Sequence, residues 1–329
     1  MSTSGAAATA TLLGYRMAAA IANALPESWS RPAGAVTGRV MGLAMRGRRQ
    51  MLARHLRRIH GPELDGSALD QAVNATFSSY GRYWLEVFRL PRQDLLALES
   101  PRFVVEGKET VDKMLAGGNG LVICTPHVGN WDLGAAWFAA RGYQPTTIVE
   151  PIEPPALFDW FCSYRRALGL NIVPLGPDAG SILLKKLREG LMVGLVCDRD
   201  LVGNGIEVEF FGERTTLPAG PATLALRAGA PVMVGANFFE GDAHRCIIRG
   251  PLDTSRQGTI KEDIARITQA VAAEFESLIR RAPDQWHLLQ PNWPSDFELV
   301  ERRPAASAGP MPASKGSAGG RPVIGEGRE

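Results

Sequence analysis

His127 is the side chain in this sequence that is best placed to do chemistry. It directly follows a short apolar run, GLVICTP at 120–126, and it precedes GNWDLGAAWFAARG, in which a helix begins. In open α/β sheets, sites are built at the carboxyl ends of strands. An imidazole at such a place titrates near neutral pH and can move a proton. His127 is therefore a candidate general base.

Asp132, five residues further on, is a candidate partner for His127. On one continuous helix the two side chains would point roughly 140° apart. With His127 on the strand-end turn and Asp132 in the first helical turn, they can face each other, and the carboxylate can hold the imidazole in one tautomer. Gly129 suits the sharp turn, and N–H groups at the helix start can face an anion. The plainer alternative is a hydrogen-bonding histidine followed by a helix-capping aspartate.

Short apolar runs that alternate with helical stretches must position these residues. Strands are predicted at 102–107, 120–126, 146–151, 171–175, 191–198, 206–211, 231–239 and 244–250, the last at an edge of the sheet. Helices are predicted at 108–116, 130–141, 155–168, 179–189, 218–228 and 259–281. This alternation predicts an α/β fold with a mostly parallel central sheet flanked by helices on both faces. The segment 206–250 is expected to add antiparallel strands.

The chain divides into three predicted regions. Residues 1–100 read as a helical N-terminal region, because apolar side chains recur at three- and four-residue steps in QAVNATFSSYGRYWLEVF. Residues 101–302 form the α/β core. Residues 303–329 are rich in Pro, Gly, Ala and Ser and are predicted to be a disordered tail.

Charge is unevenly distributed, although the net charge is only +2. The segment 28–62 holds eight arginines and no acid, interleaved with apolar residues that include Val40, Leu43, Met51 and Leu52. The segment is a solvated helix face, a nucleic-acid arm or a membrane-surface helix. The mixture favours adsorption to anionic lipid, and the whole-domain basic signature of a nucleic-acid binder is missing. The Ala-rich run 8–25 contains Arg16 and is too short to span a bilayer.

Several other chemistries lack their motifs in this sequence. No G-x-x-x-x-G-K-[ST] or G-x-G-x-x-G follows a strand, and no G-x-S-x-G is present. His55 and His60 lie in the basic helix, while His244 and His287 have no carboxylate or cysteine at ligand spacing, so no metal and no cofactor are assigned. The four cysteines lie in apolar or mixed segments without C-x-x-C spacing and are interpreted as reduced core residues.

His127-Val-Gly-Asn-Trp-Asp132 resembles the H-x-x-N-W-[DE] signature of the bacterial lipid A late acyltransferase type, within the glycerolipid acyltransferase superfamily. TTIVEP followed by SYRRALGL resembles the second block of that family, with Glu150 and Arg165 as its polar pair. LMVGLVCDRDLVGNGIEVEFFGERTTLPAGPATLALRAGAPVM resembles the third and fourth blocks. YGRYWLEVFRLP and QWHLLQPNW look closest to the actinobacterial phosphatidylinositol mannoside acyltransferases. The resemblance covers roughly residues 8–300.

The resemblance implies transfer of a long, palmitoyl-type acyl chain from acyl-CoA or acyl carrier protein to a sugar hydroxyl. The acceptor would be a glycolipid, most plausibly a phosphatidylinositol mannoside, at the cytoplasmic face of the inner membrane, where the protein is peripheral. His127 would take the hydroxyl proton, and N–H groups near Gly129 and Asn130 would stabilise the oxyanion. Acyl-CoA is then a co-substrate, and no nucleic acid is a partner. The oligomeric state is left open.

The resemblance also implies roles for individual residues. Asp198 matches a glutamate that pairs with the catalytic histidine in the mycobacterial enzymes, and it is one methylene shorter. The partner of His127 is therefore Asp198, Asp132 or Asp200. The predicted substrate-binding residues are Asn130, Trp131, Glu150, Arg165, Arg199 and Asp200. Arg165 and Arg199 would bind a phosphate or hold a site carboxylate, the alternative being a Glu150–Arg165 salt bridge that only braces the sheet.

Two other functions remain open at this level. The chain could act on another lysolipid or glycolipid acceptor, because acceptor pockets are formed by loops that the sequence does not place. It could also be a non-catalytic lipid-binding protein that kept the fold. That hypothesis requires His127 to be dispensable.

Overall fold

The structure is a computed structural model that describes residues 3–301 of the chain. Its centre is a seven-stranded sheet in the order β1-β9-β8-β2-β5-β3-β4. The bounds are β1 Phe103–Glu106, β2 Leu121–Thr125, β3 Thr146–Val149, β4 Asn171–Pro174, β5 Met192–Val196, β8 Val232–Glu240 and β9 Ala243–Arg249. The strands from β8 to β4 run parallel, and β9 pairs antiparallel with β8. The predicted α/β fold with a mostly parallel sheet is confirmed.

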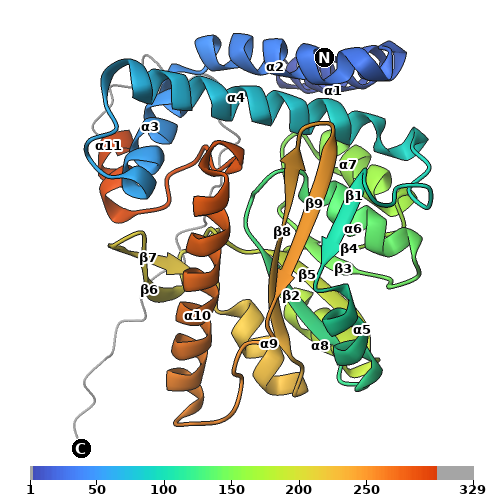
Figure 1. Cartoon of the computed structure of the whole chain (residues 1–329), viewed down its shortest axis with the longest axis vertical. Helices are drawn as coiled ribbons and strands as arrows, with labels where there is room; N and C mark the ends of the chain where they lie inside the picture. The colour runs from blue at the N-terminus through green and yellow to red at the C-terminus, as the bar shows by residue number, and fades with distance from the viewer. Residues whose placement is uncertain (1–2, 302–329) are drawn as a thin grey trace, which may run out of the picture.

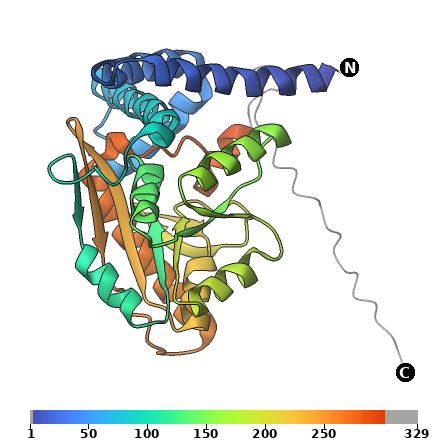
Figure 2. The same ribbon diagram turned by 90° about the vertical axis from the view of Figure 1, so that its right-hand side faces the viewer.

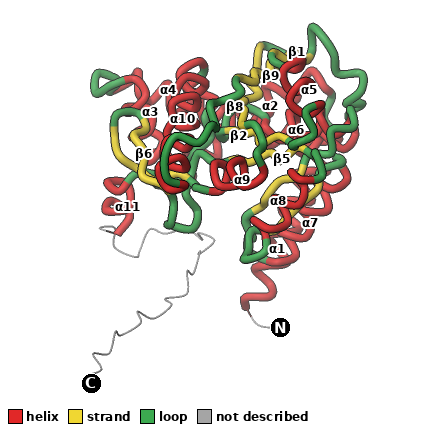
Figure 3. The backbone as a smooth tube through the Cα atoms, turned by 90° about the horizontal axis from the view of Figure 1, so that it is seen from below, coloured by secondary structure: helices red, strands yellow, loops and turns green. Residues whose placement is uncertain are grey.

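Helices cover both faces of this sheet. One face carries α5 (Lys108–Ala116), α6 (Trp131–Ala140) and α7 (Pro155–Ala167), and the other carries α8 (Ala179–Arg188), α9 (Gly220–Ala228) and α10 (Ile260–Arg281). Strand β2 shows why both faces are apolar. Val122 and Cys124 point into one core, while Leu121 and Ile123 point into the other. Figure 3, seen from below, shows α9 and α6 on opposite sides of the central strands.

Four helices precede the sheet, namely α1 (Thr3–Ala24), α2 (Glu27–Ala44), α3 (Arg46–His60) and α4 (Gly66–Arg89). Figure 1 shows α4 lying across one end of the sheet, with α1 and α2 stacked on its outer side. Figure 2 shows α1 and α2 forming one outer surface of the molecule. No helix within residues 3–301 has both the length and the apolarity that crossing a membrane requires.

Helix α2 packs on α4 through glycines. A Cβ atom at Gly38 would lie 1.9 Å from the Phe77 carbonyl oxygen, and one at Gly81 would lie 2.1 Å from the Gly34 carbonyl oxygen. Gly42 likewise faces the Phe77 ring. Because the inward face of α2 is largely backbone, its large apolar side chains are left on the outward face.

Three parts of the fold differ from expectation or were not predicted. Strand β9 is not an edge strand, because β1 pairs along its outer side. The segment 206–211 does not join the main sheet; β6 (Ile206–Phe210) pairs with β7 (Glu213–Leu217) in a separate antiparallel hairpin. Helix α11 (Pro294–Glu301) and the short 3-10 helices η1 (Leu90–Arg92) and η2 (Pro283–Gln285) were not predicted.

The predicted helix bounds in the α/β core agree with the structure to within about two residues. All four cysteines are free and buried, as their apolar surroundings predicted. The tail predicted at 303–329 lies outside the described residues. The division at residues 100 and 302 stays a prediction.

Candidate active site

His127 lies on the turn that joins β2 to α6. Gly129 has φ +59°, and a Cβ atom there would lie 2.0 Å from the backbone oxygen of Asn237 in β8. Only glycine fits this close approach and this left-handed conformation. The turn therefore crosses the carboxyl end of the sheet, where the imidazole of His127 is about one-third exposed.

Asp198 is the carboxylate that contacts His127. It follows β5, the neighbour of β2, and its side chain is fully buried. The imidazole Nδ1 lies 2.6 Å from Oδ1 of Asp198, and the backbone N–H of His127 donates to Oδ2 at 2.9 Å. Because the carboxylate accepts the Nδ1 proton, Nε2 of a neutral His127 is unprotonated. His127 is thus set up as a base at Nε2.

Burial by itself would raise the pKa of Asp198. The charge and the N–H donors of His127, together with the indole N–H of Trp286 at 2.7 Å, instead hold that pKa below its ordinary value. Asp198 is therefore ionised at neutral pH. An ionised, buried carboxylate stabilises the imidazolium that forms when His127 accepts a proton.

Asp132 has a different partner. Its carboxylate accepts two hydrogen bonds from the Arg165 guanidinium, at 2.7 and 3.1 Å, and one from the Tyr83 hydroxyl at 2.7 Å. Burial would raise the pKa of Asp132, but Arg165 and Tyr83 hold it below its ordinary value. Asp132 acts on His127 only through its charge, whereas Asp198 touches it.

The Asp132–Arg165 pair also replaces the predicted Glu150–Arg165 pair. Glu150 is exposed beyond the end of β3 and makes no ion pair with Arg165. The reason is geometric: Arg165 in α7 points under α6, toward Asp132, and not to the strand end. The Glu150–Arg165 pairing expected from the sequence is therefore wrong.

Asn130 is a structural residue in this arrangement. It is fully buried, caps α6 by accepting the N–H of Leu133, and donates its amide to Glu86 of α4 at 2.9 Å. The expected oxyanion donors are also engaged, because the N–H groups of Gly129 and Asn130 donate to the backbone oxygens of Gln285 and Asn237. The predicted role of these two N–H groups is not compatible with this structure.

Trp131 lies between His127 and the interior of the protein. Its ring meets the His127 imidazole edge-on, with centroids 5.1 Å apart, and stacks on Tyr83 at 4.1 Å. Arg199 makes no hydrogen bond or ion pair within the described part of the chain. Burial is the main reason that the pKa of Arg199 lies below its ordinary value, and the carboxylates of Glu150 and Asp198 oppose that shift.

Asp200 holds the loop that follows the strand end. One of its oxygens accepts the N–H groups of Val202 and Gly203, and the other accepts the N–H of Gly205 and the hydroxyl of Thr216. With four donors bound, the carboxylate has little capacity left for a substrate. Asp200 therefore organises a turn and makes no hydrogen bond or ion pair with His127 or Arg199.

An apolar cavity opens beside Trp131, between α6 and the sheet. It encloses about 850 Å³ of empty space, part of it open to solvent. Its floor is formed by strands β2, β3, β5, β8 and β9, and its only charged lining residues are Asp132 and Arg165. At Gly194 on β5 an added Cβ would meet no atom within 4 Å. The cavity has the apolar character of a small-molecule site.

Sequence reasoning missed the residues that complete the site from a distance. Tyr83 and Glu86 come from α4, and Trp286, His287 and Asn292 come from the segment after α10. Burial lowers the pKa of His287 to about 3, so this second imidazole is neutral. The density of tryptophan, histidine and asparagine in QWHLLQPNW was the available signal. Within residues 3–301 no group of His, Cys, Asp and Glu side chains is arranged to hold a metal ion.

The class of protein to which this fold and site belong is identified by the similarity of the sequence to a known family. The chain belongs to the bacterial lipid A biosynthesis acyltransferase family, whose model matches residues 7–295. It is therefore an acyltransferase, as the resemblance predicted.

Three curated relatives show which acyltransferases of this family the chain is similar to. The chain is 37% identical over 299 residues to the phosphatidylinositol mannoside acyltransferase of Mycobacterium tuberculosis (strain CDC 1551 / Oshkosh), covering 89% of this chain and 92% of the relative. It is 36% identical over 301 residues to the protein of that name from Mycolicibacterium smegmatis (strain ATCC 700084 / mc(2)155), covering 89% and 94%. The protein of that name from Mycobacterium tuberculosis (strain ATCC 25618 / H37Rv) is also 37% identical.

Proposed function

We propose that this chain transfers a palmitoyl-type acyl group from acyl-CoA to a mannose hydroxyl of a phosphatidylinositol mannoside, with His127 as the general base. The observation that carries the proposal is the 2.6 Å contact between His127 Nδ1 and the buried Asp198 carboxylate, beside an apolar cavity. The names of the relatives support the choice of acceptor.

In the proposed reaction His127 takes up a proton and later returns it. Nε2 of His127 takes the proton of the mannose hydroxyl while the hydroxyl oxygen attacks the thioester carbonyl carbon. The carbon–sulfur bond then breaks, and the departing thiolate takes the proton back from the imidazolium and leaves as free coenzyme A. Asp198 stabilises the imidazolium between these two events.

The acyl chain is proposed to occupy the cavity under α6. Among the lining residues, Trp131 contacts the His127 ring, and most of the other lining residues are apolar. Burial of methylene groups against this lining favours a long chain by roughly 0.8 kcal/mol for each group removed from water. Arg199, which makes no ion pair with any of the described residues, is proposed to bind a phosphate of one substrate.

Membrane contact is proposed to involve α1 and α2. Their outward faces expose large apolar side chains at helical spacing: Leu13, Met17 and Ile21 of α1, and Val36, Val40 and Leu43 of α2. The glycines of α2 face α4, and within the described residues these six side chains are exposed. A helix of this kind adsorbs to the acyl boundary of a bilayer, which brings the site to a lipid substrate at the cytoplasmic face of the inner membrane.

The arginines contribute less to this contact than the sequence suggested. Five of the eight arginines in 28–62 form ion pairs with carboxylates of the protein, namely Arg31, Arg49, Arg54, Arg57 and Arg58. Met51 and Leu52 are buried in the core and do not face outward. The proposed membrane surface is therefore apolar in character, and not a polybasic patch.

The test is transfer of radiolabelled palmitoyl-CoA to a mannosylated phosphatidylinositol by wild type, His127→Ala and His60→Ala. His60 is exposed at the end of α3 and serves as the matched histidine control. A general base contributes roughly 10²- to 10⁴-fold, so His127→Ala should lose at least about a hundredfold in rate, and His60→Ala should behave as wild type.

The outcomes separate the alternatives. If wild type hydrolyses the thioester but labels only another lysolipid or glycolipid, the chemistry stands and the acceptor is wrong. If His127→Ala labels the acceptor as fast as wild type, the assignment of the base fails. If the purified wild type neither transfers nor hydrolyses but still binds the lipid, the non-catalytic lipid-binding alternative is correct.

A further inference from the structure

The segment at residues 285–292, here called the C-terminal strap, contacts both members of the His127–Asp198 pair. The backbone N–H of His287 donates to the His127 carbonyl at 2.7 Å. The indole N–H of Trp286 donates to Oδ2 of Asp198 at 2.7 Å, and the Asn292 amide donates to the Asp198 carbonyl at 3.1 Å. Trp286 and Asn292 of the strap lie 88 and 94 residues from Asp198 along the chain, yet they complete the environment of that carboxylate.

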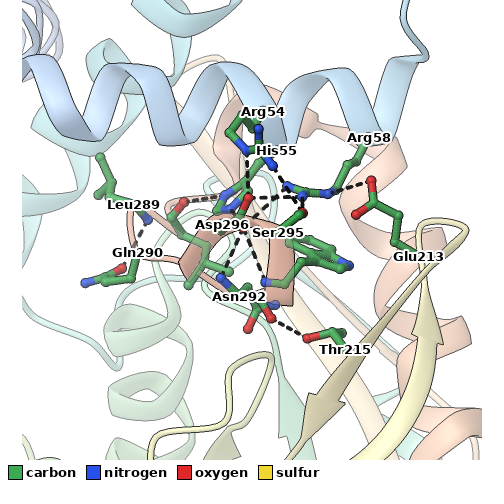
Figure 4. A network of polar contacts seen from close by, with 12 residues as sticks. Arg54, His55, Arg58, Glu213, Thr215, Leu289, Gln290, Asn292, Ser295 and Asp296 are labelled. Carbon is green, nitrogen blue, oxygen red and sulfur yellow. Dashed lines mark hydrogen bonds and ion pairs between the residues drawn. The ribbon is translucent and has the colours of Figure 1, made fainter. Parts of the chain in front are cut away.

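The strap is fixed from its other side by α3. Buried His55 contacts the Leu288 carbonyl through Nδ1 at 3.0 Å and the Asp296 carboxylate through Nε2 at 3.3 Å. Arg54 donates to the same carboxylate at 2.8 Å. Figure 4 shows this network, in which α3 faces the strap and the first turn of α11. Because His55 also packs against the Trp286 ring at 5.4 Å, the indole is held in one orientation.

The hydrogen bonds of Asp198 show what the indole contributes. Oδ1 accepts from the His127 imidazole, while Oδ2 accepts from the His127 backbone and from Trp286. The backbone donor and the imidazole both belong to His127 and move with it. Trp286 is the donor that ties the carboxylate to a separate part of the protein.

We propose that Trp286 is a positioning residue for acyl transfer, and that its indole N–H fixes the plane of the Asp198 carboxylate and thereby orients His127 for proton transfer. This proposal rests on the proposed function. Trp286 itself is buried, and its indole N–H donates to Asp198 and not to His127. It acts through Asp198 alone.

If Trp286 positions His127 through Asp198, its substitution should change the pH dependence of the rate. The Trp286 hydrogen bond is one of the causes that hold the pKa of Asp198 low, so its loss raises that pKa. A carboxylate whose pKa is raised holds a proton shared with the imidazole more strongly, so the His127–Asp198 pair takes up its proton at a higher pH and activity is lost earlier as pH falls. The other groups that act electrostatically on the pair are Asp132 from α6, His287 from the strap, and Cys197 and Arg199 beside Asp198. None of them is changed by substitution of Trp286.

The experiment compares Trp286→Phe with Trp293→Phe. Both tryptophans are buried, both pack against His55, and both changes remove the same atoms, but the indole N–H of Trp293 donates to the Phe210 carbonyl. Trp286→Phe is expected to lower kcat roughly tenfold to a hundredfold, since the lost bond is charge-assisted. The KM for palmitoyl-CoA should change little, and the acid limb of the pH–rate profile should move to higher pH. Trp293→Phe should keep the limb where wild type has it.

A measurement on the unaltered protein covers the case in which Trp286→Phe does not fold. The chain has seven tryptophans. In ¹⁵N-labelled wild type, one of their indole N–H signals should titrate with the midpoint of the acid limb, and that titration should be absent in Asp198→Asn. An unshifted limb in folded Trp286→Phe, or the absence of such an indole titration, refutes the positioning role. If wild type shows no transfer with any acceptor, the proposed function fails, while an indole signal that titrates in wild type and not in Asp198→Asn still shows that Trp286 senses Asp198.

Discussion

Replacement of Asp198 by asparagine gives a sharp prediction, because the structure dictates how the amide must lie. Oδ2 of Asp198 accepts two N–H groups, from the His127 backbone and from Trp286. An amide NH₂ at that position would face two donors, so the amide oxygen of the variant must occupy the position of Oδ2. The NH₂ group then occupies the place of Oδ1, 2.6 Å from Nδ1 of His127.

That arrangement forces the wrong tautomer of His127. An NH₂ group facing Nδ1 requires Nδ1 to accept, so the imidazole proton moves to Nε2, the atom that must take the hydroxyl proton. In Ser-His-Asp enzymes the same exchange lowers kcat by about 10⁴-fold with little change in geometry. For Asp198→Asn we expect a loss of about 10³- to 10⁴-fold in the rate of palmitoyl transfer at neutral pH, with nearly unchanged affinity for palmitoyl-CoA.

The assay is the initial rate of label transfer, paired with ¹⁵N NMR of the His127 ring to identify the protonated nitrogen. Asp132→Asn is the comparison, because Asp132 is also buried but binds Arg165 and not His127. That variant should lose stability, since a buried guanidinium is left without its anion, and should keep the wild-type tautomer. The reasoning is refuted if Asp198→Asn keeps more than about a tenth of wild-type activity, or if Asp132→Asn is the variant with the inverted tautomer.

Two further predictions concern the substrate chain and the membrane. Gly194→Leu should fill open space in the cavity and lower the rate of transfer from palmitoyl-CoA at least about tenfold relative to octanoyl-CoA. Gly180→Leu, at an exposed and equally open position on α8, should leave the ratio of the two rates unchanged. An unchanged ratio in Gly194→Leu means that the acyl chain does not occupy this cavity. Val40→Asp should weaken binding to zwitterionic vesicles, measured by sedimentation, about tenfold or more. Ile182→Asp on α8, also an exposed apolar position, should not weaken it. Equal binding of these two variants would exclude α2 as the membrane contact.

The elements of the α/β core were predictable because each is specified locally. Alternating apolar runs and amphipathic stretches predicted α5 to α10 to within about two residues. The edge of the sheet was not predictable in this way. Strand β9 reads as an edge because its sequence alternates, but whether another strand covers it depends on β1, which lies more than 130 residues earlier.

The outward face of α2 illustrates a different limit. Its apolar residues and arginines were visible, and the mixture predicted a surface helix. The sequence did not show that Gly34, Gly38 and Gly42 turn inward against α4, or that Arg58 is bound to Asp296. Both facts depend on which helix is the neighbour, and neighbours are chosen by tertiary packing.

At the site, the sequence places His127 at a strand end before a glycine turn, with carboxylates following at 132 and 198. These are local facts, fixed by the strand, the turn and the helix start. Which carboxylate pairs with His127 depends on the packing of the sheet. Asp132 is five residues from His127 but points to Arg165, while Asp198 is 71 residues away and touches it, because β2 and β5 are neighbours in the sheet. A carboxylate pairs with the group that folding brings within hydrogen-bond distance, and separation along the chain does not measure that distance.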